Sequence, residues 1–410
     1  MKGGQVHRKV AVIGSGVAGL TAAHVLRATH DVTLYEADER LGGHAHTHDV
    51  AGLAVDTGFI VHNDRTYPHL TRLFRELGVA TQESDMSMSV RCDGCGLEYA
   101  GGKGVTGLLA RRPSAAYLRL LADVPRFHRM ARALLETDDD RTLGEVTGHF
   151  PAYFTRHFLT PLVAAVWSCS PATALRYPAR YLFTFLANHG MLSVSGSPQW
   201  RTVTGGSRSY VEKVAKGLTA VRTATPVREL RRHADAVEIR DDGDETVTYD
   251  AAVVATHPGQ ALALLAAPTD LERRVLGGFP YSRNPAVLHT DAGVLPRAGR
   301  ARASWNYRMS GCAAEPSSVR VSYDMTRLQR LPTDTRYLVT LGDDVPAGHV
   351  IARMDYEHPV YTPETVALQK LLPGLSDGRV AFAGAYHGWG FHEDGCRSGL
   401  SAAENLGARW

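Results

Sequence analysis

The chain has few cysteines, little net charge and no long apolar segment, and each absence excludes a class of protein. Its five cysteines are scattered over 410 residues, which excludes the dense disulfide framework of a small secreted domain. The formal charge of +3 is close to neutral for this length and excludes a large nucleic-acid-binding surface. The longest apolar runs, such as Ala261–Ala267, are far shorter than the roughly 20 residues that a transmembrane helix needs.

The composition is that of a folded globular protein of enzyme size. The apolar fraction of 44% excludes wholesale disorder, and at roughly 150 residues per domain the length predicts two or three structural units. The segment Met1–Lys9 is short and polar and shows no secretory signal, so we expect a cytoplasmic protein. The sequence gives no indication of the oligomeric state.

A unit of strand, glycine-rich turn, helix and strand begins at Lys9. Lys9–Ile13 is a β-branched run typical of a buried parallel strand, Gly19–Ala28 has helical composition, and Asp31–Glu36 predicts a second strand. Together they span about 30 residues, the size of one βαβ unit. The turn between the first strand and the helix reads Gly14-Ser15-Gly16-Val17-Ala18-Gly19, which is a GxGxxG motif.

The spacing of these glycines predicts a dinucleotide-binding turn. Gly14 permits the tight turn, Gly16 lets the backbone approach a diphosphate, and Gly19 lets the helix pack on the strand. The N-terminus of the helix that follows then stabilises the diphosphate charge. Glu36 ends the second strand, about 20 residues further on, where a carboxylate accepts hydrogen bonds from the adenosine ribose.

Signals of the same kind recur later in the chain and predict a discontinuous domain. Asp250–Thr256 and Val380–Gly384 are short buried strands, whereas residues 105–166 are helical and residues 271–373 mix strands with loops. We predict an α/β fold in which a Rossmann-like nucleotide-binding domain with a parallel sheet is assembled from residues 1–85, 200–270 and 375–410. An inserted α+β substrate-binding domain is predicted over residues 86–199 and 271–374.

Glu36 is followed by Ala37-Asp38-Glu39-Arg40-Leu41-Gly42-Gly43, and at this point the chain resembles a known family. The resemblance is to the flavin-containing amine oxidase and phytoene desaturase superfamily. Other similar segments are Asp56–Ile60, Gly205-Gly206, Val253–Thr256, Phe382–Gly384 and Gly395–Ala403. The resemblance implies a GR2-type FAD-binding domain. It also implies that FAD is bound non-covalently, since no Cys or His stands where the family forms a covalent link.

The motif and the resemblance together predict the FAD-binding residues. In the family, Arg40 and Gly42-Gly43 lie along the diphosphate, the backbone at Gly58 passes the isoalloxazine ring, and the backbone at Val227 meets the adenine. A helix beginning near Asp394 would aim its N–H groups at the flavin. The predicted set is Gly14, Gly16, Val17, Ala18, Gly19, Glu36, Ala37, Arg40, Gly42, Gly43, His44, Gly58, Phe59, Ile60, Val227, Gly384, Glu393 and Asp394.

Departures from the classical amine oxidases argue against amine oxidation. Residues 217–369 contain no lysine to stand near the flavin, His392 takes the position of a cage tyrosine, and Ala385 replaces a glutamate. Two segments, 188–192 and 390–398, resemble predicted FAD-binding oxidoreductases associated with modified fatty acids.

The sequence therefore predicts an FAD-dependent oxidoreductase that takes a hydride onto flavin N5 from an unsaturated hydrophobic substrate, fatty-acid-like or lipid-like. The reaction would be a desaturation or a redox-neutral double-bond isomerisation. Two alternatives stay open: a flavin amine oxidase that uses O₂, and a non-catalytic flavin-binding partner protein.

His392 is the leading catalytic candidate, because an imidazole beside the flavin could exchange a proton at neutral pH. A histidine held by hydrogen bonds for structure is an equally good interpretation. Trp389 and Phe391 are predicted to wall the substrate pocket, with ordinary core packing as the alternative. Glu393 and Asp394 would cap the last helix rather than take part in catalysis.

Three further patterns have simple structural interpretations. The arginines spread over residues 111–132 indicate either a helix that contacts anionic lipid or a solvated basic face over a core stripe, with the second favoured. Cys92 and Cys95 form CxxC without a second pair at zinc spacing, and Asp93-Gly94 is a favoured hairpin turn. The alternate histidines His44, His46 and His48 fit a strand face. No metal site is predicted.

Overall fold

The apolar run near the start of the chain forms the central strand of a parallel sheet. In the computed structural model, which describes residues 8–193, 196–312 and 319–410, all neighbouring pairs in this five-stranded sheet are parallel. Met1–His7, from the polar segment considered above, lie outside the described residues. The sheet order is β10 (Ala220–Arg222), β2 (His30–Tyr35), β1 (Arg8–Ile13), β14 (Ala251–Val254) and β20 (Val380–Phe382).

Both faces of this sheet are covered, which explains why its strands are apolar throughout. Val10 and Val12 belong to one hydrophobic core, and Ala11 and Ile13 belong to another on the opposite face. The first core includes α1 (Val17–Leu26), α2 (Pro68–Glu76), α10 (Arg208–Ala215) and α15 (His392–Asn405). The second includes β11 (Val227–Arg232), β12 (Val237–Asp241), β13 (Thr246–Tyr249), α11 (Pro258–Leu264) and α12 (Asp270–Leu276). We call this assembly the parallel-sheet lobe.

A second, mixed sheet forms the other lobe, which we call the mixed-sheet lobe. Five of the six pairings between its seven strands are antiparallel, and the parallel one joins β16 to β7. Its order is β19 (Val350–Pro359), β15 (Tyr281–His289), β18 (Leu338–Leu341), β17 (Val321–Asp324), β16 (Trp305–Met309), β7 (Met88–Cys92) and β8 (Glu98–Gly101). The hairpin predicted around Asp93-Gly94 is β7–β8.

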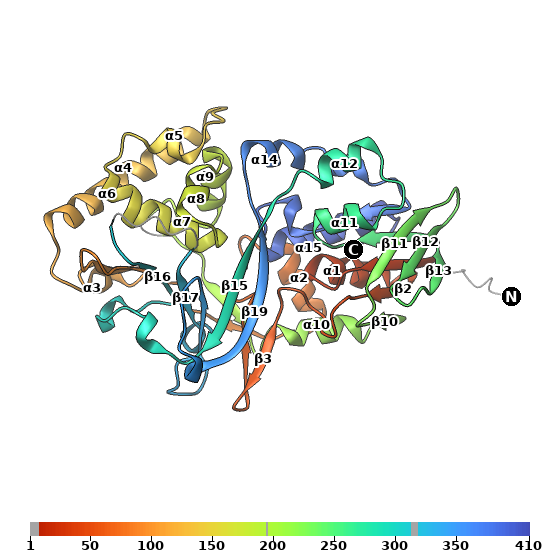
Figure 1. The fold of residues 1–410 in the computed structure, drawn as a ribbon, viewed down its shortest axis with the longest axis horizontal. Helices are drawn as coiled ribbons and strands as arrows, with labels where there is room; N and C mark the ends of the chain where they lie inside the picture. The colour runs from red at the N-terminus through yellow and green to blue at the C-terminus, as the bar shows by residue number, and fades with distance from the viewer. Residues whose placement is uncertain (1–7, 194–195, 313–318) are drawn as a thin grey trace.

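Helices cover the mixed sheet, and Figure 1 shows them on the left, with β15 and β19 between them and the parallel-sheet lobe. They are α3 (Gly104–Leu108), α4 (Ala115–Leu135), α5 (Leu143–Thr147), α6 (Ala152–Phe154), a π-helical turn (Thr155–Leu159), α7 (Thr160–Trp167), α8 (Pro171–Leu175) and α9 (Ala179–Asn188). The other strands and α-helices of the described residues are β3 (Thr47–Val50), β4 (Leu53–Asp56), β5 (His62–Asn63), β6 (Thr81–Glu83), β9 (Trp200–Val203), α13 (Met325–Leu328) and α14 (Pro363–Gln369).

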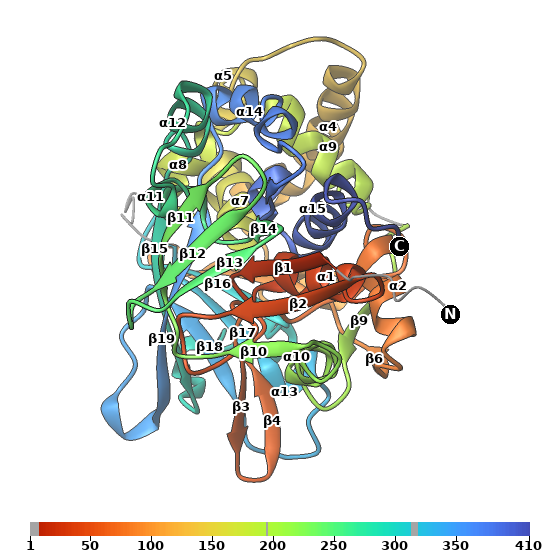
Figure 2. The same ribbon diagram turned by 90° about the vertical axis from the view of Figure 1, so that its right-hand side faces the viewer.

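Helices α1 and α15, from opposite ends of the chain, lie side by side (Figure 2). A Cβ atom on Gly395 would stand 2.6 Å from Val17 Cγ1, and one on Gly399 would collide with the carbonyl oxygen of Ala18. These two glycines are one helical turn apart, so they present one flat strip to α1. The contact therefore requires glycine although glycine weakens a helix interior.

We predict that Gly399→Ala destabilises the fold, in contrast to the usual effect of alanine in a helix. The added methyl group must displace the α1 backbone, and overpacking of this kind costs about 1–3 kcal/mol. The matched control is Gly259→Ala in α11, where a Cβ atom meets nothing within 4 Å and alanine should stabilise by about 0.4–1 kcal/mol. Urea unfolding measures the change in the free energy of unfolding for both variants. Equal stabilisation by both would contradict the packing argument.

Candidate active site

The turn between β1 and α1 presents an uncapped helix N-terminus. Gly14 has a φ of +99°, and a Cβ atom there would stand 2.7 Å from the carbonyl oxygen of Ala255. Helix α1 begins at Val17 with Gly16 as N-cap, no side-chain cap and no acidic residue in its first turn. A Cβ atom on Gly16 would meet nothing within 4 Å, so space lies open there. The first turn, with Ala18 and Gly19, thus offers backbone donors that suit a diphosphate.

Glu36 stands at the end of β2 and fixes the position of this turn. One carboxylate oxygen accepts hydrogen bonds from the Ser15 backbone N–H, at 2.9 Å, and from the Ser15 hydroxyl. The other accepts from the Asp38 N–H at 3.0 Å, across the exposed Ala37. The Thr225 N–H donates to the Glu36 carbonyl, which places the start of β11, with Val227, beside the end of β2.

The segment that follows folds back over the same turn. The Arg40 guanidinium donates to the carbonyl oxygens of Gly43, at 2.9 Å, and of Leu41 and Ala45. The Gly42 N–H donates to both oxygens of Ser15. A Cβ atom on Gly43 would stand 3.2 Å from Gly16 Cα. The two glycine segments therefore form one cradle, whose walls are backbone rather than side chain.

His44 follows this cradle and has an unsatisfied buried nitrogen. Its Nε2 is buried without a hydrogen-bond partner among the described residues, and its ring packs against Tyr356 and His358. Burial lowers the pKa of His44 well below the ordinary histidine value, so the ring is neutral. The Phe59 N–H donates to the His44 carbonyl, and a Cβ atom on Gly58 would collide with that carbonyl. Such a nitrogen fits a polar group of a bound cofactor.

His392 opens helix α15 and packs on the predicted flavin segment. Its ring stacks on Phe59 with centroids 3.7 Å apart, and its Nε2 lies 3.2 Å from the Tyr210 hydroxyl. Desolvation, with a smaller effect of His62, lowers the pKa of His392 to about 3. A neutral, hydrogen-bonded imidazole favours the structural interpretation of this residue over proton exchange at neutral pH.

Glu393 and Asp394 both cap helices, but not the same one. The Glu393 carboxylate accepts from the backbone N–H groups of His69 and Leu70, so it caps α2 rather than the helix on which it lies. Asp394 accepts from the Phe391 N–H at 3.1 Å and caps α15 itself. Burial raises the pKa of Asp394 to about 6. The structure thus fits the capping prediction for Asp394 and gives Glu393 a different helix.

Two other members of the predicted set are held by backbone contacts. Gly384, after β20, donates its N–H to the Ser398 hydroxyl of α15 at 2.9 Å, which ties the last strand to the last helix. Ile60 accepts from the Thr202 hydroxyl at 2.8 Å, which ties the segment after Gly58 to β9.

A cavity of about 420 Å³ lies beside the N-terminus of α15. Phe391 and Phe185 stack there with ring centroids 4.7 Å apart, and the Trp389 indole N–H donates to the Tyr181 carbonyl. The lining residues are Arg65, Thr66, Tyr67, Pro68, His69, Phe185, Asn188, His189, Trp389, Phe391, Glu393, Asp394 and Arg397. Sequence reasoning missed Tyr67 and Phe185, because neither α9 nor the segment before α2 contains a recognisable motif.

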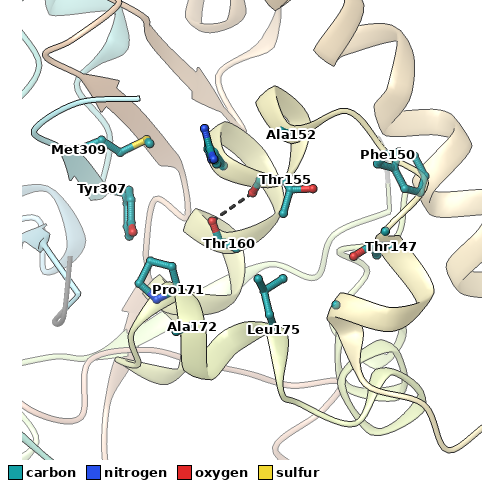
Figure 3. A pocket seen from close by; sticks show the side chains of 13 residues that line it. Thr147, Phe150, Ala152, Thr155, Thr160, Pro171, Ala172, Leu175, Tyr307 and Met309 are labelled. Carbon is teal, nitrogen blue, oxygen red and sulfur yellow. Dashed lines mark hydrogen bonds between the residues drawn. The ribbon is translucent and has the colours of Figure 1, made fainter. Parts of the chain in front are cut away.

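A larger cavity, of about 530 Å³, lies elsewhere, between the helices of the mixed-sheet lobe and β16 (Figure 3). Tyr307 and Met309 form one wall, and the segments from α5 to α8 form the others. The Thr160 hydroxyl donates to the Thr155 carbonyl at its edge. None of the predicted FAD-binding or catalytic residues lines this cavity, so the candidate active site is the smaller one.

The basic segment 111–132 falls mainly in α4, whose arginines face solvent. Arg119, Arg126 and Arg129 are exposed, whereas Phe127 and Leu120 are buried in the core. This is the solvated basic face that the sequence favoured. Within the described ranges no helix is long and apolar enough to cross a membrane.

Comparison with known proteins identifies the family. Residues 17–287, more than half of the chain, match the family described as flavin containing amine oxidoreductase. The chain therefore belongs to this family, and it is an FAD-dependent oxidoreductase with a Rossmann-like FAD-binding fold. The cradle, the uncapped α1 and the orphaned His44 nitrogen described above fit FAD.

One curated relative agrees with this assignment, and two solved structures share the fold of this chain. The protein named flavin-containing monoamine oxidase AofH, from Mycobacterium tuberculosis, is 28% identical over 326 residues, or 75% of this chain and 68% of that protein. Cyclohexylamine oxidase from Brevibacterium oxydans has a TM-score of 0.71 at 16% identity, covering 98% of both chains. A fatty acid isomerase from P. acnes has a TM-score of 0.72 at 15% identity, covering 98% of this chain and 99% of that one.

We predict that Glu36→Ala weakens FAD binding by roughly tenfold or more, because a lost hydrogen bond to a charged group costs about 1.5–3 kcal/mol. The matched control is Glu39→Ala, which removes an exposed carboxylate three residues away. Titration of the apoprotein with FAD, followed by flavin fluorescence, gives both dissociation constants. Equal affinity in the two variants would remove Glu36 from the cofactor site.

Proposed function

We propose that the enzyme oxidises or isomerises an unsaturated hydrophobic substrate, fatty-acid-like or lipid-like, in the cavity beside α15. FAD supplies the hydride acceptor when it is bound. The observation that carries the proposal is the aromatic wall of this cavity, which includes Phe185, Trp389 and Phe391. Such a wall binds apolar chains and excludes water from the reacting carbon.

The rim of the cavity suits a substrate with an acidic head group. Arg65 lies at this rim and is exposed, and both of its terminal nitrogens donate to carbonyl oxygens, of Asn188 and Gly196. Carbonyl oxygens leave the positive charge of Arg65 uncancelled. Arg397, also at the rim, pairs with Asp394 instead. A free carboxylate on the substrate would therefore find its partner at Arg65.

Amine oxidation is the second candidate, and the names of two relatives support it. AofH is named a monoamine oxidase, and the Brevibacterium protein is a cyclohexylamine oxidase. Against it, Lys216 and Lys370 are both exposed and follow α10 and α14, and no lysine lines the cavity. The similarity in fold to a fatty acid isomerase supports the first candidate.

Contact with a lipid surface stays a prediction. Val105 and Leu118 are exposed apolar side chains, 69% and 52% accessible, in the region of the exposed Arg112 and Arg119. Apolar and basic side chains together are the combination that an anionic membrane surface attracts. Such a surface would also be the source of a water-insoluble substrate.

We predict that anaerobic mixing with cis-unsaturated fatty acids changes either the flavin spectrum or the substrate. Lasting bleaching indicates dehydrogenation, whereas a moved double bond with the flavin oxidised at the end indicates isomerisation. Primary and secondary amines should leave both unchanged. Bleaching by amines, with steady peroxide formation in air, would favour amine oxidation instead.

The Arg65→Gln variant tests the head-group part of the same proposal. It should raise KM for a fatty acid but not for the corresponding alcohol, since only the acid carries a charge. Arg75→Gln, which changes an exposed arginine outside the cavity lining, is the matched control.

We predict that flavin reduction by substrate shows no pH dependence from His392. With a pKa of about 3, this imidazole stays neutral as pH falls from 8 to about 4 and gains its proton only near pH 3. The pH profiles of the reduction rate in the parent enzyme and in His392→Gln should therefore have the same shape. An inflection near pH 6 in both would report Asp394, whose pKa is raised by burial. An inflection that only His392→Gln loses would make His392 the proton-exchanging group.

A further inference from the structure

Three cysteines and a histidine meet at a point that the flavin site does not use. Their ligand atoms all lie within 4.8 Å of one another. They come from the end of β7, the β7–β8 turn, the π-helical turn and the loop after β16. This cysteine–histidine cluster consists of Cys92, Cys95, His157 and Cys312.

Two of the separations within the cluster match the edges of a zinc tetrahedron. The Sγ atoms of Cys92 and Cys312 are 3.6 Å apart, and Cys95 Sγ is 3.7 Å from His157 Nε2. With Zn–S bonds of about 2.3 Å and Zn–N bonds of about 2.0 Å, tetrahedral edges are about 3.5–3.8 Å. Three thiolates and one imidazole are a ligand set that structural zinc sites use.

The histidine is held in the tautomer that a metal requires. His157 Nδ1 lies 3.0 Å from the Tyr153 carbonyl oxygen. A carbonyl can only accept, so Nδ1 carries the proton, and the lone pair of Nε2 faces Cys95. A backbone carbonyl in this position is the usual second partner of a zinc-ligating histidine. The His157 side chain is buried, at 1% exposure, and is not available for water.

The backbone around the cysteines is shaped for close approach. A Cβ atom on Gly94, between the two cysteines of the hairpin turn, would stand 2.9 Å from Gly311 Cα. The Asp93 N–H donates to the Met309 carbonyl, which joins the turn to the end of β16. Gly96, at a φ of +70°, then returns the chain into β8. Larger residues in the turn would hold the loop that carries Cys312 away.

We propose that the cysteine–histidine cluster binds one Zn²⁺ ion as a structural site. On binding, the three thiols release their protons to solvent, three Zn–S bonds and one Zn–N bond form, and the ion gives up its bound waters to solvent. Four protein ligands leave no open position for substrate, so the site is not catalytic. It joins the π-helical turn to the mixed sheet. The same turn supplies Thr155 and Arg156 to the larger cavity, so the metal also fixes that wall (Figure 3).

The test is metal analysis of the purified FAD-loaded protein. We expect one zinc per chain, with no change in FAD content when a chelator removes it. Cys95→Ser and His157→Gln should each reduce zinc to less than a tenth of the parent value and lower the thermal midpoint. The matched controls, Cys169→Ser and His149→Gln, change a cysteine and a histidine outside the cluster and should keep the full zinc content.

Two results would overturn the proposal. A parent protein that binds no zinc, even after reduction and incubation with one equivalent of Zn²⁺, would do so. So would zinc that persists in both cluster variants. Thiol titration identifies the competing arrangement, since two thiols that appear only after reduction would indicate a disulfide between Cys92 and Cys312. The chelator experiment on the parent protein decides the matter even where a variant fails to fold.

Discussion

The contact between α1 and α15 is the constraint on which the nucleotide site depends. These helices come from opposite ends of the chain, and Gly395 and Gly399 allow their backbones to touch. Because the contact lies near the beginning of each helix, it brings two helix N-termini into one region. Gly19 likewise allows the α1 backbone to approach the turn before it, because a Cβ atom there would collide with the carbonyl oxygen of Gly14. Side chains larger than hydrogen at these positions would separate the two sets of backbone donors.

The same region joins the predicted FAD-binding segments to the cavity beside α15. Asp394 caps α15, Glu393 caps α2, and both line the cavity that Phe185, Trp389 and Phe391 also line. Their hydrogen bonds fix two helix ends at once, so the cavity and the flavin segment around Phe59 are held in one arrangement. Burial raises the pKa of the Asp394 carboxyl to about 6 and lowers the pKa of the neighbouring His392 to about 3, so His392 stays neutral.

Local pattern was sufficient to predict the family and the cofactor, because these depend on short segments. The motifs that indicate FAD, the turn at Gly14–Gly19 and the segment from Glu36 to Gly43, are each short and continuous in sequence. The cavity was less predictable, because Phe185 lies on α9. The apolar residues of this helix show the same spacing as those of an ordinary core helix. From sequence alone Cys92 and Cys95 indicate only a hairpin turn, because the other members of the cluster are distant, with Cys312 lying 220 residues after Cys92. A search for ligands near one another in sequence does not find such a site.

The order of strands in the parallel sheet has a consequence for synthesis on the ribosome. Strands β1 and β2 emerge first, but their sheet is completed by β20 and closed by α15, at residues 380–405. Until then the apolar faces of β1 and α1 lack their final partners. Pairing between strands so distant in sequence slows folding in general and lengthens the exposure of apolar surface. A truncation that removes α15 would therefore destabilise β1 and α1, which lie near the other end of the chain.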